Sequence, residues 1–354
     1  MNAQFTQHNL IFKQASGTSR GVLTTKETYL LEISENNKKG IGECAIFRGL
    51  SYDDVPDYEE KLTWLCKNIN LDFEVLKKEL LHYPSIIFGL EQALLNLEHG
   101  EDLYFPSDFT DGKDSIKING LIWMGNADFM QSQIEEKLAK GFDCIKLKIG
   151  VDWKSEKEII KKLREKFPKE QLELRVDANG AFSYEEARMV LQELADLGIH
   201  SIEQPIKKSE VRSPKSEENS EINSTDCCVP WNEMAKLCAE TPTPIALDEE
   251  LIGVIDFEEK KKLLETIKPQ YIILKPALVG GFSGSDEWIA IAENLGINWW
   301  ITSALESNIG LNAICQYTYT KKNPLPQGLG TGALFTNNFE THLQLEGDQM
   351  WHKK

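Results

Sequence analysis

Five short segments of the chain each end an apolar run with charged side chains that could take part in catalysis. They read KLK (146–148), RVDAN (175–179), IEQP (202–205), ALDEE (246–250) and ILKP (273–276). Three supply a carboxylate, from Asp177, Glu203 and Asp248, and two supply an amine, from Lys148 and Lys275. Hard divalent cations prefer carboxylate ligands, and lysines can act as bases or as fixed positive charges. The set indicates metal-assisted acid–base chemistry.

The spacing of these groups is regular. Lys148 to Asp177 spans 29 residues, Asp177 to Glu203 spans 26, and Asp248 to Lys275 spans 27. Each interval has about the length of one strand with its following helix. The exception is the 45 residues between Glu203 and Asp248, which include a polar insertion at 207–230. Because the reacting groups of a βα barrel lie where its strands end, the spacing predicts one shared site.

We expect Asp177, Glu203 and Asp248 to bind Mg²⁺, or Mn²⁺ in its place. Three carboxylates together with water and substrate oxygens make the oxygen-only octahedron that these ions prefer. Zinc is disfavoured, because none of the six histidines lies in these segments. Taken alone, each acid is more commonly a solvated loop residue or a helix cap, so the prediction depends on the set.

Two lysines of one strand, Lys146 and Lys148, are predicted to point into the barrel, because side chains two apart on a strand share a face. Ile145, Leu147 and Ile149 then face the helices. Crowding with a metal ion and with each other is expected to lower the lysine pKa values, which would make one of them a base near neutral pH. A structural salt bridge inside the barrel is the alternative.

The order of elements predicts an α/β barrel preceded by an α+β region. Residues 1–115 read as strands followed by helices, including a helix with Ser85 as its expected cap and Gly100 at its end. From 116 to 330 short apolar strands alternate with amphipathic helices, near 118–122, 143–148, 172–177, 199–203, 244–248, 270–275, 298–303 and 327–330. Eight strands favour a closed barrel, and an open doubly wound sheet remains the alternative.

Composition limits the partners. The net charge of −17 argues against a nucleic-acid partner, whose phosphates need a basic surface. The first residues lack a basic stretch followed by a long apolar run, so we expect a cytoplasmic protein without signal peptide or membrane anchor. The seven cysteines show no CxxC spacing, and we expect reduced thiols, including the adjacent Cys227 and Cys228. No sequence feature indicates an oligomeric state.

The five segments, in this order, resemble those of the enolase superfamily, specifically its muconate-lactonising branch. Longer stretches resemble the o-succinylbenzoate synthase family of menaquinone biosynthesis, namely TSRGVL (18–23), GECAIFRGLS (42–51), SIIFGLEQAL (85–94), INGLIWMG (118–125), TSALESNIGL (302–311) and GLGTGALF (328–335). The resemblance implies a modified (β/α)₇β TIM-type barrel at 116–330 and an α+β capping domain at 1–115, completed by the C-terminal tail 331–354.

The resemblance also implies roles. It makes the substrate a small carboxylate, 2-succinyl-6-hydroxy-2,4-cyclohexadiene-1-carboxylate, which is dehydrated to 2-succinylbenzoate through a metal-stabilised enediolate. Lys148 would remove the α-proton, Lys275 would act as a cation opposite, and Lys146 would lower the pKa of Lys148. The weaker candidates are Arg175, which would bind a carboxylate oxygen or neutralise the nearby acids, and Asn179 and Glu249, which would support the metal ligands. Ser303 would contact the succinyl chain, and Arg48, in a loop of the capping domain, would be a substrate contact or an ordinary surface residue.

Two other functions fit the same residues. An N-acylamino-acid racemase or dipeptide epimerase would use Lys148 and Lys275 as bases on opposite faces of one carbon. No DxD pair stands near the eighth predicted strand, where dipeptide epimerases are expected to have one. A binding protein with a catalytically silent barrel is the third alternative, and the intact set of site residues speaks against it.

Overall fold

The computed structural model describes residues 1–18, 21–123, 127–208 and 231–353. Most of the predicted insertion at 207–230, with Cys227 and Cys228, lies outside these residues. The five described cysteines are free thiols, as expected. Within the described ranges, we find no helix of the length and apolarity that crossing a bilayer requires.

The N-terminal part is an antiparallel sheet covered by three helices. The strands β1 (Asn2–Thr18), β2 (Gly21–Glu35) and β3 (Lys38–Cys44) pair in this order. Helices α1 (Tyr58–Asn68), α2 (Phe73–Glu79) and α3 (Pro84–His99) follow and share a hydrophobic core with the sheet. In β3, Gly40 and Gly42 allow close approach to α3, because a Cβ atom on Gly42 would lie 1.9 Å from the carbonyl oxygen of Gly89.

One helix boundary differs from the prediction. Helix α3 begins at Pro84 with Tyr83 as its N-cap, and the hydroxyl of Ser85 donates to Asp53 at 2.6 Å instead of capping the helix. The fixed φ of proline suits the first helical position, so the helix starts one residue before Ser85. The expected end at Gly100 is confirmed.

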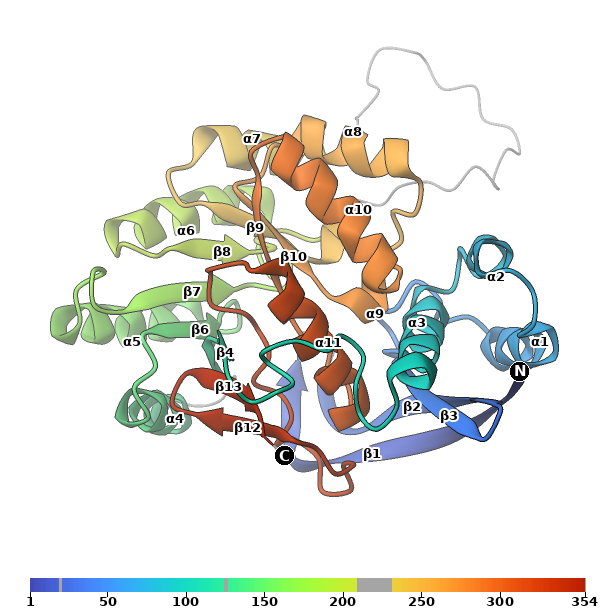
Figure 1. The fold of residues 1–354 in the computed structure, drawn as a ribbon. Coiled ribbons are helices and arrows are strands. Elements are labelled where there is room, and N and C mark those ends of the chain that lie inside the picture. The colour runs from blue at the N-terminus through green and yellow to red at the C-terminus, as the bar shows by residue number, and fades with distance from the viewer. Residues whose placement is uncertain (19–20, 124–126, 209–230, 354) are drawn as a thin grey trace, which may run out of the picture.

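Seven parallel strands form the barrel wall, in sequence order around the ring (Figure 1). They are β5 (Gly120–Ile122), β6 (Cys144–Lys148), β7 (Glu173–Asp177), β8 (Ser201–Glu203), β9 (Ile245–Leu247), β10 (Tyr271–Leu274) and β11 (Asn298–Ile301). The eighth predicted strand is reduced to two bridges, which join Gln327 to Ile118 and Gly328 to Thr302. These bridges link β11 to the residues before β5 and close the ring.

Helices follow the barrel strands on the outside of the ring. They are α4 (Ala127–Ala139), α5 (Trp153–Lys166), α6 (Tyr184–Asp196), α7 (Asn232–Glu240), α8 (Phe257–Ile267), α9 (Pro276–Val279), α10 (Gly281–Asn294) and α11 (Asn308–Lys321). Ser183 and Glu186 form a capping box at the start of α6, whose buried face includes Ala187 and Leu191. Caps and apolar faces of this kind fix where each helix starts and how it lies on the strands.

The chain ends in a hairpin. Strands β12 (Leu343–Glu346) and β13 (Gln349–His352) pair with each other, and β13 pairs with β4 (Ser115–Lys117). Earlier in the tail, Phe335 forms a bridge with Phe12 of β1. The tail therefore contacts both parts of the chain, and the division into a capping domain at 1–115 with 331–354 and a barrel at 116–330 stays a prediction.

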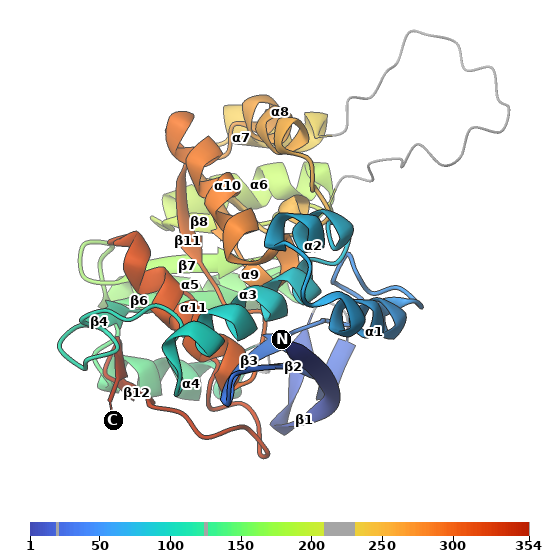
Figure 2. The same ribbon diagram turned by 45° about the vertical axis from the view of Figure 1, so that its right-hand side comes forward.

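Helix α3 joins the N-terminal part to the barrel, and it contacts α9 and α10 in the centre of Figure 2. Its Glu91 is buried and accepts the backbone N–H groups of Phe282 and Ser283 at 2.5 and 3.1 Å, at the start of α10. Burial raises the pKa of Glu91 to about 7, although these hydrogen bonds act in the opposite direction.

Glu91 should make stability fall as pH rises. A carboxyl group whose pKa is raised on folding stabilises the folded state most at pH values below its unfolded pKa, and this stability is lost as pH rises through the folded pKa. We expect the free energy of unfolding of Glu91→Gln, relative to the wild type, to increase by roughly 2–3 kcal/mol between pH 5 and pH 8. Urea unfolding of both proteins at several pH values measures this difference in the free energy of unfolding. Glu98→Gln, exposed on the same helix, should show no such trend, and a constant difference for Glu91→Gln would contradict the assignment.

Candidate active site

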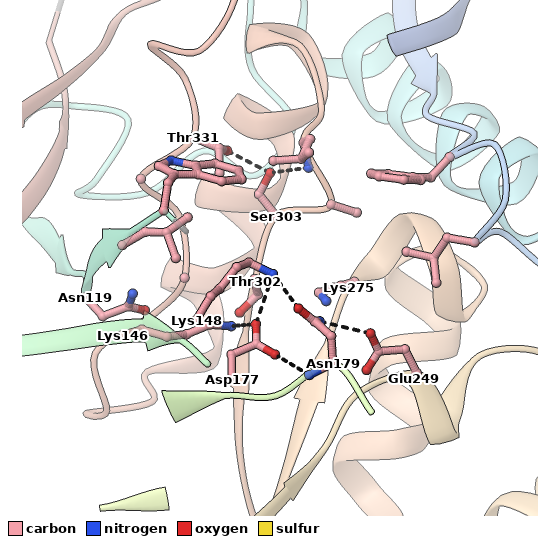
Figure 3. Close-up of a pocket in the computed structure, with 18 residues that line it drawn as sticks. Asn119, Lys146, Lys148, Asp177, Asn179, Glu249, Lys275, Thr302, Ser303 and Thr331 are labelled. Carbon is pink, nitrogen blue, oxygen red and sulfur yellow. Dashed lines mark hydrogen bonds and ion pairs between the residues drawn. The ribbon is translucent and has the colours of Figure 1, made fainter. Parts of the chain in front are cut away.

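A pocket opens where the barrel strands end, on the side that faces the N-terminal part (Figure 3). Charged side chains gather at its base, and apolar side chains together with Ser303 and Thr331 line the rest of it. The lining residues are Phe47, Leu50, Asn119, Leu121, Trp123, Lys146, Lys148, Asp177, Asn179, Glu249, Lys275, Thr302, Ser303, Ala304, Leu305, Gly328, Gly330 and Thr331.

The structure brings all five groups of the strand-end segments together. Lys146 Nζ lies 3.1 Å from Asp177 Oδ2 and also forms an ion pair with Glu203. Lys275 pairs with Asp248, and its Nζ lies 3.8 Å from Glu203 Oε1. Lys148 Nζ lies 3.4 Å from Asp177 Oδ2. The carboxylates of Glu203 and Asp248 thus contact the lysines without lining the pocket themselves.

The β-strand register explains this meeting. Lys148 pairs with Asp177, and Asp177 pairs with Glu203, in the ladders of β6, β7 and β8. The pairing places three successive strand ends at the same height of the barrel. Ile145, Leu147 and Ile149 lie in the core outside, so the predicted inward direction of Lys146 and Lys148 is confirmed.

The electrostatics of this cluster differ from the prediction. Burial alone would lower the pKa of Lys146, but the charges of Asp177 and Glu203 outweigh burial and raise it. The pKa of Lys275 is raised in the same way, mainly by Asp248. The expected lowering counted the charge of a metal ion, whereas the chain's own neighbours of these amines are mostly acids. Without the ion both lysines are therefore held as cations.

The three carboxylates respond unequally to burial. Burial would raise the pKa of Asp177, but Lys146 and Lys148 outweigh it and hold that pKa low. Burial and the nearby charge of Asp177 raise the pKa of Glu203, and burial raises that of Asp248. Burial thus opposes the ionised form of two of the three acids, although three lysines lie near them.

The residues present fit a hard divalent cation. Asp177, Glu203 and Asp248 are each only 2% exposed. Glu203 Oε1 and Asp248 Oδ1 are buried and have no hydrogen-bond partner within the described part of the chain. A buried unpaired carboxylate oxygen is unfavourable unless a ligand satisfies it. The donor set contains oxygen only, which suits Mg²⁺ or Mn²⁺.

Asn179 connects the base of the pocket. Its side-chain oxygen accepts a hydrogen bond from Lys148 Nζ at 2.6 Å, and its Nδ2 donates to Glu249 Oε1 at 3.1 Å (Figure 3). Its backbone φ of +45° lies in the left-handed region, which asparagine tolerates better than most residues. Asn179 and Glu249 thus lie at the base of the pocket, as the sequence suggested, and Asn179 orients Lys148.

Ser303 lies in the opposite wall. Its hydroxyl donates to Glu306 at 2.5 Å and accepts from Thr331 at 2.8 Å. Glu306 is fully buried and holds this turn together, so its role is structural. Leu305, with φ of +64°, lines the pocket in the same turn. Such a conformation is costly for leucine and is maintained only by the surrounding contacts.

The structure corrects the prediction for Arg175. This side chain is 1% exposed, donates to Glu173 at 2.7 Å and to the carbonyl of Pro326 at 2.9 Å, and lies over the ring of Trp300. These partners lie toward the start of the strands, away from the pocket. Arg175 shares the inward face with Asp177, but it occupies a lower layer of the barrel and cannot reach a substrate.

Arg48 also fails to reach the pocket. It is partly exposed and pairs with Glu27 and Asp54. Its neighbours Phe47 and Leu50 line the pocket instead, so the loop of the N-terminal part does cover the site. The cover is apolar rather than cationic.

Sequence reasoning missed several residues of the site. Asn119, Thr302 and Thr331 line the pocket, and each lies in or beside a stretch that resembles relatives, which was the available signal. Gln204 was also missed. Its fully buried side chain accepts the backbone N–H groups of Asp248 and Glu250 at 3.3 and 3.2 Å, which fixes the loop that carries Asp248.

Comparison with known proteins adds to this geometry. A family profile described as "Enolase C-terminal domain-like" matches residues 130–217 and 226–349. The o-succinylbenzoate synthase of Desulfotalea psychrophila is 41% identical over 98% of both chains. The chain belongs to the enolase superfamily. A crystal structure of MenC from Desulfotalea psychrophila superposes with a TM-score of 0.83 at 39% identity and covers 99% of each chain. The N-succinylamino acid racemase of Thermus thermophilus is 33% identical over 50% of this chain and 40% of its own.

Membership of this superfamily confirms the predicted fold class. The chain is an enolase-superfamily enzyme with a TIM-like barrel and two separate antiparallel sheets, and it resembles a lyase over nearly its whole length. The racemase matches only half of the chain. The alternative of an open doubly wound sheet is wrong, because the bridges at Gln327 and Gly328 close the ring.

Proposed function

We propose that this enzyme converts 2-succinyl-6-hydroxy-2,4-cyclohexadiene-1-carboxylate into 2-succinylbenzoate and water, with Mg²⁺ as its cofactor. The observation that carries the proposal is the whole-length similarity to an o-succinylbenzoate synthase, in a chain whose strand-end lysines and acids gather at one pocket. The reaction removes the proton α to the ring carboxylate and expels hydroxide from the neighbouring carbon. The ring becomes aromatic, which drives the second step.

Lys148 is the best candidate for the base. Lys146 is bound between two carboxylates that raise its pKa, so it stays protonated. Lys148 lines the pocket, its closest carboxylate oxygen lies 3.4 Å away, and its hydrogen bond goes to the neutral amide of Asn179. Lys148 is therefore placed to meet the substrate's α-proton, whereas Lys146 is held by two carboxylates. The proton taken by Lys148 can then be given to the departing oxygen to form water.

Lys275 is proposed as a fixed cation on the other side of the pocket. Its pKa is raised by Asp248 and Glu203, so it remains charged while negative charge develops on the substrate carboxylate. Asp177, Glu203 and Asp248 would hold the magnesium ion, which when bound supplies positive charge to the substrate's carboxylate oxygens. The same acids that raise the pKa of Lys275 would then share their charge with the ion.

The pocket walls fit a ring with polar substituents. Phe47, Leu50 and Trp123 offer apolar contact for a six-membered ring and exclude water from the site. Ser303 and Thr331 also line the pocket. Thr331 donates to Ser303 and Ser303 donates to Glu306, so a hydroxyl would have to turn away from its present acceptor to donate to the carboxylate or ketone of a succinyl chain. The sequence prediction for Ser303 as a substrate contact stays a proposal of this kind.

An N-acylamino-acid racemase is the second candidate, and the half-length similarity to an N-succinylamino acid racemase favours it over other epimerases. The deciding assay follows the ultraviolet absorbance of the cyclohexadiene substrate with and without Mg²⁺. In parallel, N-succinyl amino acids are incubated with enzyme in deuterated water and their α-deuterium content is measured. We expect Mg²⁺-dependent dehydration. Deuterium exchange without any dehydration would overturn the proposal in favour of the racemase, and inactivity in both assays would favour a binding protein.

Lys275→Arg separates the two activities in one variant. Arginine keeps the positive charge but does not act as a base, because its pKa exceeds about 12. As a dehydratase the variant should keep measurable turnover, roughly 10-fold to 100-fold below wild type, whereas Lys275→Ala should be lower still. As a racemase it should lose turnover completely, since one face of the α-carbon would lack its base. Steady-state kinetics on both substrates distinguish these outcomes.

A further inference from the structure

A second cluster of side chains that could bind a metal ion lies outside the pocket, and none of its three residues lines that pocket. Asp102 stands in the segment between α3 and β4, His342 directly precedes β12, and His352 is the last residue of β13. His342 Nδ1 lies 2.7 Å from Asp102 Oδ2, and His352 Nε2 lies 3.1 Å from the same oxygen. The ligand atoms of all three residues lie within 4.8 Å of one another.

We propose that Asp102, His342 and His352 form a second metal site that binds a divalent transition-metal ion of the Zn²⁺ type and fastens the C-terminal hairpin to the segment after α3. Two imidazole nitrogens and one carboxylate are a donor set that zinc accepts in proteins. Nitrogen donors also distinguish this site from the oxygen-only set of the barrel, which suits Mg²⁺.

Two of the three ligands are already held in place. The backbone carbonyl of Asp102 accepts hydrogen bonds from Asn312 at 2.9 Å and Gln316 at 2.8 Å, both on α11. His352 is fully buried, belongs to the ladder of β12 and β13, and lies against the ring of Phe109. A site whose ligands are fixed before binding loses little conformational entropy when the ion arrives.

The third ligand gives access from solvent. The side chain of His342 is 43% exposed, so an ion can reach the cluster and a water molecule can complete a four-coordinate shell. The net charge of −17 raises the concentration of cations near the surface in general. The exposed position also means that His342 can be replaced without opening the core.

The cluster has unused ligand capacity. Asp102 Oδ1 is buried and has no hydrogen-bond partner in the part of the chain that the structure describes, while two donors converge on Oδ2 of the same carboxylate. Both histidines therefore converge on one oxygen of the carboxylate and leave the other oxygen free for a ligand. An ion between the three groups would replace two histidine protons and engage this carboxylate.

One feature of this cluster limits the affinity that we expect for a metal ion. His352 Nδ1 is also buried without a partner among the described residues, whereas a metal-bound histidine usually donates its second N–H group. We therefore expect a site of moderate affinity, weaker than that of a zinc protein with complete outer hydrogen bonds. Without metal, the cluster would remain a hydrogen-bonded Asp–His–His group.

The test uses the full chain with the barrel site saturated by Mg²⁺. Zn²⁺ binding is measured by calorimetry and by the change in the unfolding temperature, and Co²⁺ is added separately to record its visible spectrum. We expect one equivalent of Zn²⁺ to bind and to raise the unfolding temperature. Co²⁺ should give the strong absorption of a four-coordinate site with nitrogen ligands rather than the weak absorption of an octahedral oxygen site.

His342→Gln is the deciding variant, with His82→Gln as its matched control. His82 is an exposed histidine at the other end of α3, about 24 Å along the helix from the cluster side. We expect His342→Gln to lower Zn²⁺ affinity at least 10-fold and to abolish the thermal shift, with unchanged Mg²⁺-dependent turnover. Equal Zn²⁺ binding by wild type and His342→Gln, or no binding to the wild type beyond displacement of Mg²⁺, would overturn the proposal.

Discussion

Lys148→Ala is expected to lower turnover by at least about 10³-fold while the protein stays folded and still binds Mg²⁺. General bases contribute roughly 10²-fold to 10⁴-fold, and a carboxylate's α-proton is too weakly acidic to leave without one. The fold should persist, because Asp177 keeps its contact with Lys146 at 3.1 Å. Steady-state dehydration kinetics, calorimetry with Mg²⁺ and thermal unfolding measure the three quantities.

Lys148→Arg distinguishes a base from a positive charge at the same position. Arginine retains the charge beside Asp177 but cannot accept the substrate proton, so it should be as inactive as Lys148→Ala. Lys140→Ala, an exposed lysine that pairs only with Glu136 among the described ion pairs, serves as the control and should turn over like wild type. Wild-type turnover in Lys148→Ala, or substantial turnover in Lys148→Arg, would remove Lys148 from the role of base.

The chemistry-bearing residues could be predicted because strand ends are encoded locally. An apolar run followed by a charged residue marks the C-terminal end of a barrel strand. Intervals of 26 to 29 residues, about one strand and its helix, place the ends of successive strands at the same end of the barrel. The capping box of Ser183 and Glu186 is equally local, and it is confirmed. Such signals depend on neighbours within a few residues, which is why the sequence alone reveals them.

The height of a side chain inside the barrel is not encoded locally. Alternation predicts that Arg175 and Asp177 share the inward face, but only the packing of Trp300 and Pro326 shows that Arg175 fills the lower layer. The prediction that the lysine pKa values are lowered was wrong for a related reason. They depend on which acids from other strands approach each amine, and Lys146 meets both Asp177 and Glu203.

Contacts between segments far apart in the chain also could not be predicted from the sequence. The eighth strand is only a pair of bridges, so its weak pattern at 327–330 reflects its short length. In the N-terminal part the sequence indicates strands at 28–34 and 40–47 but not β1, whose pairing with β2 defines it. In the cluster of Asp102, His342 and His352, the histidines lie 240 and 250 positions from the aspartate, so no local spacing could predict it.

Asp248→Asn is expected to abolish Mg²⁺-dependent turnover with little loss of stability. A divalent ion bound at the reacting carboxylate contributes several kcal/mol to catalysis, so a site that no longer holds it should lose about 10³-fold or more in turnover. Asparagine keeps the shape of the side chain but removes the negative charge that attracts the ion. Calorimetry should show at least about tenfold weaker Mg²⁺ binding.

The stability argument follows from the charges of the cluster. Breaking a buried ion pair usually costs about 3–5 kcal/mol, because one charge is left unpaired. Here four carboxylates, from Asp177, Glu203, Asp248 and Glu249, surround three ammonium groups, and burial already raises the pKa of Asp248. Removing one of four acids leaves three for three lysines, so we expect the free energy of unfolding of Asp248→Asn to fall by less than about 2 kcal/mol in metal-free buffer.

A comparison of Asp248→Asn with Lys148→Ala separates the role of the metal ion from the role of the base. Lys148→Ala should bind Mg²⁺ and fail to turn over, whereas Asp248→Asn should fail at both, and excess Mg²⁺ should restore part of the turnover only in Asp248→Asn. Asp196→Asn, an exposed acid at the end of α6, controls for loss of a negative charge and should behave like wild type. If Asp248→Asn bound Mg²⁺ with wild-type affinity, Asp248 would not be a ligand, and a different set of residues would have to hold the ion.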